Sequence, residues 1–133
     1  MSRLVVNVDG GSRGNPGQAA VGAVLSTPDG DVVDERGERI GVATNNVAEY
    51  KAVLLGVALA LEHGVEELEV VGDSELIVKQ IQGRYKVKNA DLKPLHAEAR
   101  AALRGVGKWS IRHVRREHNS HADELVNRAL DAD

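Results

Sequence analysis

The chain has no cysteine and no phenylalanine, and its 133 residues include one tryptophan and two tyrosines. Without thiols it can form no disulfide, cysteine nucleophile or thiolate zinc site. The shortage of aromatic rings argues against a protein that binds nucleic acid by stacking bases on aromatic side chains. The core must therefore come from Val, Leu, Ile and Ala, which suits a β-sheet covered by aliphatic helices.

A membrane-spanning run is also missing. The longest apolar stretch, around residues 52–61, is too short to cross a bilayer, and no apolar signal segment follows Met1. We therefore expect a soluble, cytoplasmic protein. The length supports one core, so we expect a single domain over residues 1–133, with a monomer as the default state.

Excess positive charge is lacking too, because the formal net charge is −3. The charges are segregated, however. Residues 76–116 contain eleven Lys or Arg and two acidic residues, a net charge of +9, whereas the rest of the chain carries −12. This segment is either a solvated face or a basic flank for nucleic acid beside an acidic site. The second possibility predicts binding that weakens steeply with salt.

Hydrophobic periodicity predicts nine elements in the order βββαβααβα. The first three strands form an antiparallel meander, and the later strands are joined by helices. This order predicts an α/β protein with a mixed five-stranded sheet flanked by helices. The Gly-rich segment 10–17 is predicted as a tight loop. The predicted strands are 4–9, 19–26, 32–40, 67–72 and 109–114, and the predicted helices are 45–63 with Thr44 as N-cap, 75–82, 91–103 and 119–130.

Four carboxylates occupy notable places in this scheme. Asp9 and Asp73 each end a strand, and the C-terminal ends of parallel neighbouring strands meet at the edge where α/β sheets bind ligands. Glu49 and Asp123 each lie one turn into a helix and can point toward that edge. Taken singly, Asp73 could be an N-cap, Asp9 a turn residue, and the other two solvated helix positions. Together they favour one site.

Carboxylates held this close repel one another unless they are protonated or bridged by cations. Oxygen ligands without cysteine select Mg²⁺ or Mn²⁺ rather than Zn²⁺. Two such ions can activate a water and hold a phosphodiester. The pattern therefore points to nuclease chemistry.

The four carboxylates belong to the segments VDGGSRGNPG (8–17), TNNVAE (44–49), GDS (72–74) and HNSHADEL (118–125). In this order they resemble the ribonuclease H type 1 family, in a short form without the basic protrusion of some members. The resemblance implies a ribonuclease H-like fold and an endonuclease that cuts the RNA strand of RNA–DNA hybrids, leaving 3′-hydroxyl and 5′-phosphate ends. It implies two Mg²⁺ ions, with Mn²⁺ as a substitute, held by the catalytic carboxylates Asp9, Glu49, Asp73 and Asp123.

The resemblance also implies a substrate surface and a proton-transfer residue. By position, the contacts to the hybrid fall on Gly10, Gly11, Ser12, Asn15, Thr44, Asn45 and Asn46. Taken alone, the glycine segment would be an ordinary hairpin turn. Some members carry a mobile histidine on a long loop before the last carboxylate; here that loop is short, and His118 is the candidate, with His121 behind it. Either histidine could equally be an exposed or capping residue.

Two other functions remain open at this stage. One is a non-catalytic module on the same fold that binds hybrid or double-stranded RNA, since a fold does not guarantee activity. The other is a DNA-cleaving relative that keeps the metal chemistry. Clustered negative charge facing phosphates counts against the first, and the Asn45-Asn46 and Gly10-Gly11-Ser12 segments count against the second.

Overall fold

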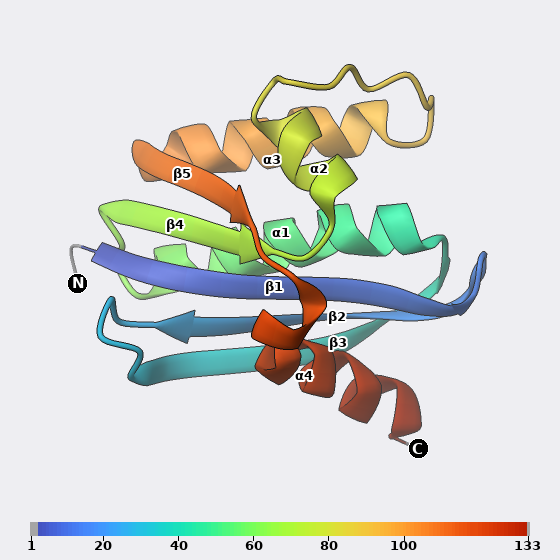
Figure 1. Cartoon of the computed structure of the whole chain (residues 1–133), viewed down its shortest axis with the longest axis horizontal. Helices are drawn as coiled ribbons and strands as arrows, with labels where there is room; N and C mark the ends of the chain where they lie inside the picture. Colours follow the sequence, from blue (N-terminus) through green and yellow to red (C-terminus); the bar gives the residue numbers. More distant parts are fainter. Residues whose placement is uncertain (1–2, 133) are drawn as a thin grey trace.

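A computed structural model describes residues 3–132, and Figure 1 shows its elements. The strands form one sheet in the order β3-β2-β1-β4-β5. β1 and β2 pair antiparallel, as do β2 and β3, whereas β4 runs parallel to β1 and β5 parallel to β4. The predicted mixed sheet is confirmed. The bounds are β1 Arg3–Gly14, β2 Gly17–Ser26, β3 Val32–Ala43, α1 Asn45–Glu62, β4 Glu67–Gly72, α2 Glu75–Ile81, α3 Lys93–Val106, β5 Lys108–His113, a 3₁₀ turn Arg116–His118, and α4 Ser120–Asp131.

The Gly-rich segment differs from its prediction. It was expected as a loop over residues 10–17, but β1 and β2 stay paired as far as Gly14 opposite Gly17, so the turn is confined to residues 15–16. Glycines lack the side-chain alternation that identifies a strand, and the pattern therefore hid this extension. β3 likewise continues past residue 40 to Ala43 and carries the chain directly into α1.

Two hydroxyl caps begin the helices next to the site. The Thr44 hydroxyl accepts a hydrogen bond from the Val47 N–H at 3.2 Å, as predicted for α1. At α2, either Asp73 or Ser74 was a possible cap, and the structure uses the Ser74 hydroxyl, which accepts from the Ile77 N–H at 3.4 Å. The carboxylate of Asp73 is thereby left for other partners.

Helices cover both faces of the sheet, with α1 on one face and α4 on the other (Figure 1). Each of these helices packs directly over a glycine of the sheet. A Cβ atom at Gly10 would lie 2.2 Å from the Ala48 carbonyl oxygen of α1, and one at Gly22 would lie 2.7 Å from the Ala122 carbonyl oxygen of α4. Because Gly22 is opposite Asp9 in the sheet, α4 comes close to β1 at the level of that carboxylate.

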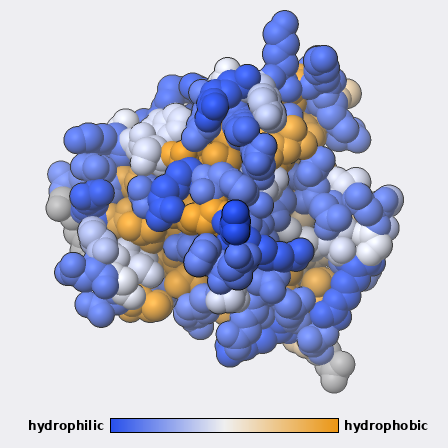
Figure 2. Space-filling model, in the orientation of Figure 1, coloured by the Kyte–Doolittle hydropathy of each residue, from blue (hydrophilic) through white to orange (hydrophobic). Residues whose placement is uncertain are grey.

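The core is aliphatic, as its composition predicts. Tyr50 is its one large aromatic side chain among the described residues, and its hydroxyl donates to Gln80 Oε1 at 2.6 Å in the interior. On the outside, Figure 2 shows hydrophilic residues over most of the face in view, with hydrophobic residues exposed in separate small patches. Within residues 3–132, no helix combines the length and apolarity needed to cross a membrane.

Candidate active site

The ends of β1 and β4 bring three carboxylates together. Val8 and Gly72 form the last parallel pair between these strands, so Asp9 and Asp73 come next on each side. Glu49 reaches the same point from the start of α1. One carboxylate oxygen from each of Asp9, Glu49 and Asp73 lies within 4.8 Å of the other two, a spacing at which they could share a metal ion. The expected meeting of strand ends is therefore observed.

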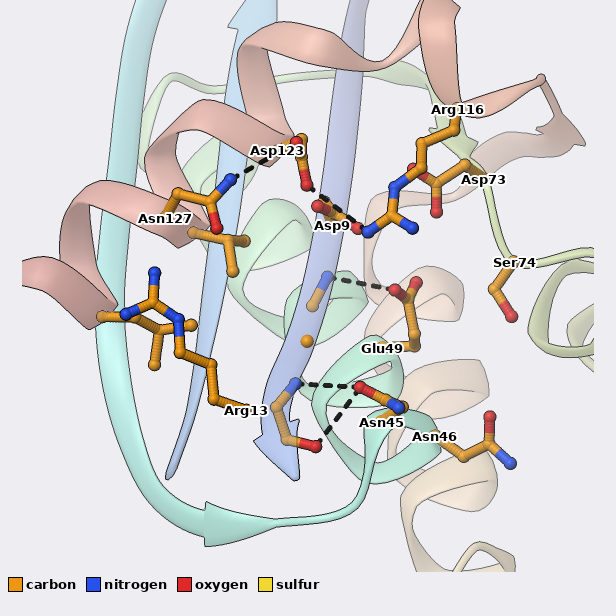
Figure 3. A pocket seen from close by; sticks show the side chains of 15 residues that line it. Asp9, Arg13, Asn45, Asn46, Glu49, Asp73, Ser74, Arg116, Asp123 and Asn127 are labelled. Carbon is orange, nitrogen blue, oxygen red and sulfur yellow. Dashed lines mark hydrogen bonds and ion pairs between the residues drawn. The ribbon is translucent and has the colours of Figure 1, made fainter. Parts of the chain in front are cut away.

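Asp123 joins this group from the opposite face of the sheet. It lies in the first turn of α4, and its proximity to Asp9 contributes to the raised pKa of that carboxyl group. Asn127, one turn further along α4, donates to Asp123 Oδ2 at 3.4 Å. All four predicted carboxylates line one open pocket of about 450 Å³, which Figure 3 shows from close by. The fourth carboxylate thus comes from a helix that packs on β2 at Gly22, directly beside Asp9 of β1.

Burial and crowding make Asp9 and Glu49 hard to ionise. Desolvation, the negative charge of Asp73 and a hydrogen bond that protonated Asp9 donates to Asp123 raise the pKa of Asp9 to about 7. The pKa of Glu49 is held well above its usual range by burial and then by the charges of Asp9 and Asp73, although the Gly10 N–H that donates to it at 3.2 Å works in the other direction. A bound cation would remove the repulsion. Oxygen ligands alone suit a hard divalent ion such as Mg²⁺.

Asn119 is a buried partner of this cluster that the sequence analysis did not single out. Its side chain is 2% exposed, and its Nδ2 donates to the Val8 carbonyl at 2.8 Å and to Asp73 Oδ2 at 3.2 Å. Its Oδ1 accepts from Asn7 Nδ2 at 3.1 Å. One amide thus ties β1 to Asp73 at the point where α4 begins. The available signal was its place as the first residue of the predicted helix 119–130, which does not indicate a carboxylate partner.

The predicted substrate residues divide into five that line the pocket and two that support them. Asn45 Oδ1 accepts hydrogen bonds from the Ser12 N–H at 2.9 Å and the Ser12 hydroxyl at 3.3 Å. Asn15 Oδ1 in turn accepts from the Asn45 N–H at 3.1 Å. Thr44 caps α1 and, like Asn15, does not line the pocket, whereas the other five predicted residues do: Gly10, Gly11, Ser12, Asn45 and Asn46.

His118 does not join the carboxylates. It lines a second pocket of about 210 Å³ with Asn7 and Ser26, and His121 lines the same pocket and contacts Glu35 Oε2 at 2.7 Å. The side chain from this segment that does reach the carboxylate pocket is Arg116, whose NH2 lies 3.6 Å from Asp123 Oδ1. Arg116 belongs to the basic segment identified from the sequence, but neighbouring arginines gave no pattern by which to choose it.

Arg13 is a second cation of the pocket that the sequence analysis passed over. It follows Ser12 on β1, and its NH1 pairs with Asp131 Oδ1 at 2.6 Å. In Figure 3, Arg116 lies beside the carboxylates, whereas Arg13 lies away from them, on the side of Asn127. The pocket therefore holds two guanidinium groups besides its carboxylates.

The chain is similar to known proteins over almost its whole length. The family described as reverse transcriptase-like matches residues 7–129. Ribonuclease HI of Halobacterium salinarum is 48% identical over 129 residues, which are 97% of this chain and 65% of that protein. The bifunctional protein Rv2228c of Mycobacterium tuberculosis is 44% identical over 131 residues, 98% of this chain and 36% of that protein. The chain thus spans just under two thirds of the halobacterial relative and about a third of the mycobacterial one.

Solved structures agree closely with the fold. The crystal structure of RNase H1 from Halobacterium salinarum has a TM-score of 0.95 and 46% sequence identity, covering 98% of each chain. LC11-RNase H1, whose crystal structure is described as a complex with an RNA/DNA hybrid, has a TM-score of 0.92 and 41% identity, covering 96% of each chain. The backbone that carries the four carboxylates is thus shared over nearly the full length of the described chain.

Proposed function

The chain belongs to the ribonuclease H type 1 family, and from this premise we propose that it is an endonuclease that hydrolyses the RNA strand of RNA–DNA hybrids, leaving 3′-hydroxyl and 5′-phosphate ends. The observation that carries the proposal is the convergence of Asp9, Glu49 and Asp73 oxygens within 4.8 Å in an open pocket. LC11-RNase H1, a relative with the same fold, is described in complex with an RNA/DNA hybrid.

The proposed cofactor is a pair of Mg²⁺ ions, with Mn²⁺ able to replace them. Asp9, Glu49, Asp73 and Asp123 would hold them. The pKa values of Asp9 and Glu49 are raised by burial and by neighbouring negative charge, and bound cations would offset this repulsion. When bound, such ions supply an activated water and neutralise charge at the phosphate that is cut. Asp9 and Glu49 would then ionise more readily, because the added positive charge stabilises their charged forms.

The residues around the carboxylates position the groups that react. Asn119 holds the Asp73 carboxylate through its 3.2 Å hydrogen bond. Asn45 holds the backbone and hydroxyl of Ser12 at the rim of the pocket. The small residues Gly10 and Gly11 line the same wall, which lets a sugar–phosphate backbone approach closely. His118 is not part of this proposed set, because it lines the other pocket.

Discrimination between RNA and DNA requires polar groups near the 2′-hydroxyl. The rim formed by Ser12, Asn45 and Asn46 supplies amide and hydroxyl groups beside the carboxylates, where the cut strand must lie. A third pocket, of about 370 Å³, lies between α2 and the segment that follows it. It is lined by Leu76 of α2 and by Arg84, the exposed Tyr85, Lys86 and Lys88. Its charge suits the backbone of the uncut strand and the steep salt dependence predicted from the sequence.

The proposal is tested by incubating the protein with a labelled RNA–DNA hybrid, an RNA duplex and a DNA duplex in parallel, each with Mg²⁺ or Mn²⁺. We expect cleavage of the RNA strand of the hybrid and its loss in Asp73→Asn, whereas Asp29→Asn, in the exposed turn before β3, should cut like the wild type. Tight hybrid binding without turnover in either metal would instead identify a binding module. Equal cutting of the DNA duplex would identify a DNA nuclease.

A further inference from the structure

The Arg13–Asp131 ion pair spans one end of the candidate active site. Arg13 is near the end of β1 and Asp131 is the last residue of α4, so the pair joins the hairpin to the helix that carries Asp123. Both side chains are exposed, by 50% and 65%, and the nitrogen–oxygen distance is 2.6 Å. An ion pair this exposed to water adds little to stability.

The fold does not depend on this pair to secure α4. Arg39 on β3 already caps the helix, since its Nε donates to the Ala129 carbonyl at 2.7 Å and its NH2 to the Leu130 carbonyl at 3.2 Å. Moreover, a carboxylate in the last turn of a helix faces the negative end of the helix dipole. Asp131 is therefore unfavourably placed for its own helix, and its position is explained by the guanidinium that it contacts.

A guanidinium that accepts a carboxylate offers the same fork of N–H donors to a phosphate. Arg13 lines the pocket that holds the metal-binding carboxylates, as does Arg116. A polyanion bound in the pocket with one phosphate at the carboxylates can place a neighbouring phosphate at Arg13, because Arg13 and the carboxylates line the same pocket. Its phosphate can replace Asp131, because the released carboxylate returns to water.

Resting on the proposed function, we propose that Arg13 binds a phosphate of the RNA strand beyond the one that is cut, and that Asp131 is an internal competitor which this phosphate displaces. Arg13 is then a substrate-positioning residue. Asp131 keeps the guanidinium directed into the pocket in the free protein. It weakens binding because the phosphate must displace it from Arg13.

The experiment measures steady-state cleavage of a labelled hybrid at several salt concentrations for Arg13→Ala, Asp131→Asn and the double variant. Arg13→Ala should raise KM by about tenfold, as expected for loss of a charged hydrogen bond. It should also reduce the slope of log KM against log salt by about one phosphate contact. Asp131→Asn should lower KM by about two- to fourfold, the scale of an exposed ion pair. The double variant should match Arg13→Ala, because the competitor acts only through Arg13.

The Arg36–Glu62 pair provides matched controls. It joins β3 to α1 through contacts of 2.9 and 3.2 Å, and it does not line the pocket. Arg36→Ala and Glu62→Gln remove the same charges from a comparable exposed pair, so both should leave KM and its salt slope unchanged. Thermal melts of all variants would show that each is folded.

Two results would overturn the proposal while leaving the proposed function intact. If the wild type cuts the hybrid and Arg13→Ala keeps its KM and salt slope, Arg13 binds no phosphate. If Asp131→Asn raises KM as Arg13→Ala does, the carboxylate supports binding and is no competitor. Failure of the wild type to cut the hybrid is a different result, because it would refute the proposed function itself.

Discussion

Asn119 Nδ2 lies 3.2 Å from Asp73 Oδ2 and, on its other side, 2.8 Å from the carbonyl oxygen of Val8. The amide therefore fixes one metal-binding carboxylate to the strand that carries another, Asp9. Partners of metal ligands orient the ligands and tune their affinity. This contact makes Asn119 a positioning residue, which touches neither substrate nor the proposed ions.

Asn119→Ala should weaken metal binding. We expect the Mg²⁺ concentration for half-maximal cleavage to rise by about 10- to 100-fold, with activity recovered at high Mg²⁺. Stability should fall by about 1–3 kcal/mol, because the buried Val8 carbonyl loses its donor. Asn89→Ala, which removes an exposed side chain bonded to the Asp91 N–H, is the control. A variant that loses stability but keeps its Mg²⁺ requirement would show that Asn119 serves the fold alone.

Asp9→Asn should stabilise the metal-free protein at neutral pH. The pKa of Asp9 is about 7 in the folded protein against 3.8 as its ordinary value, so folding takes up a proton between these pH values. Stability therefore falls as pH rises from about 4 to about 7, because the unfolded chain ionises first. The amide removes this penalty, and the pH dependence should become flatter.

The measurement is urea unfolding in EDTA at several pH values between 5 and 8. Asp31→Asn, at an exposed position before β3, should follow the wild type. Adding Mg²⁺ should stabilise the wild type more than Asp9→Asn, since a ligand that binds only the folded state adds stability that grows with the logarithm of its affinity. Equal pH profiles for wild type and Asp9→Asn would contradict the charge repulsion inferred at this site.

Gly22→Ala should push α4 away from the sheet. A Cβ atom at this position would lie 2.7 Å from the Ala122 carbonyl oxygen, which cannot move without its helix. We expect a loss of about 1–3 kcal/mol, as for other overpacked interiors. Because Asp123 follows Ala122 directly, cleavage at limiting Mg²⁺ should fall as well.

The control is Gly105→Ala in α3, where an added Cβ meets no atom within 4 Å. That substitution should leave cleavage unchanged and add up to about 1 kcal/mol of stability from helix propensity. Thermal melts and Mg²⁺-dependent cleavage would be measured side by side. Undiminished cleavage by Gly22→Ala at limiting Mg²⁺ would show that the close packing of α4 at Gly22 is not needed for cleavage.

Tyr50→Phe isolates stability from the site. The Tyr50 hydroxyl donates to Gln80 Oε1 at 2.6 Å in the interior, so its removal leaves a buried acceptor unsatisfied, at a cost of about 1–3 kcal/mol. Combining it with Gln80→Met should recover part of this loss, because both polar partners are then absent. If the loss of stability in the double variant equals the sum of the two single losses, the two side chains are not coupled.

The sequence predicted the order of elements and the mixed sheet, and it predicted that Asp9 and Asp73 meet if their strands are parallel neighbours. These features follow from local periodicity and from the rule that ligands gather at the ends of parallel strands. The extended hairpin escaped prediction because glycines carry no facing side chains. Whether Ser74 or Asp73 capped α2 depended on side-chain geometry, which the residue types alone leave open.

Long-range contacts account for the remaining differences. Asn119 and Asp73 are 46 residues apart, and Arg13 and Asp131 are 118 apart, so no local pattern relates them. The family resemblance places a histidine before the last carboxylate, and His118 is the candidate at that position in the sequence. The 3₁₀ turn over Arg116–His118 instead directs the arginine to the carboxylates, and the histidine lines the second pocket.

The site takes Asp9 from the first strand and Asp123 from the last helix. The two come together because α4 packs closely on the sheet at Gly22. A ribosome making this protein therefore releases the first carboxylate more than a hundred residues before the last. Until α4 is synthesised and docked, the growing chain has three of its four proposed metal ligands and no outer wall to its pocket. A site built this way gains its fourth carboxylate only after α4 has been synthesised and has packed on the sheet.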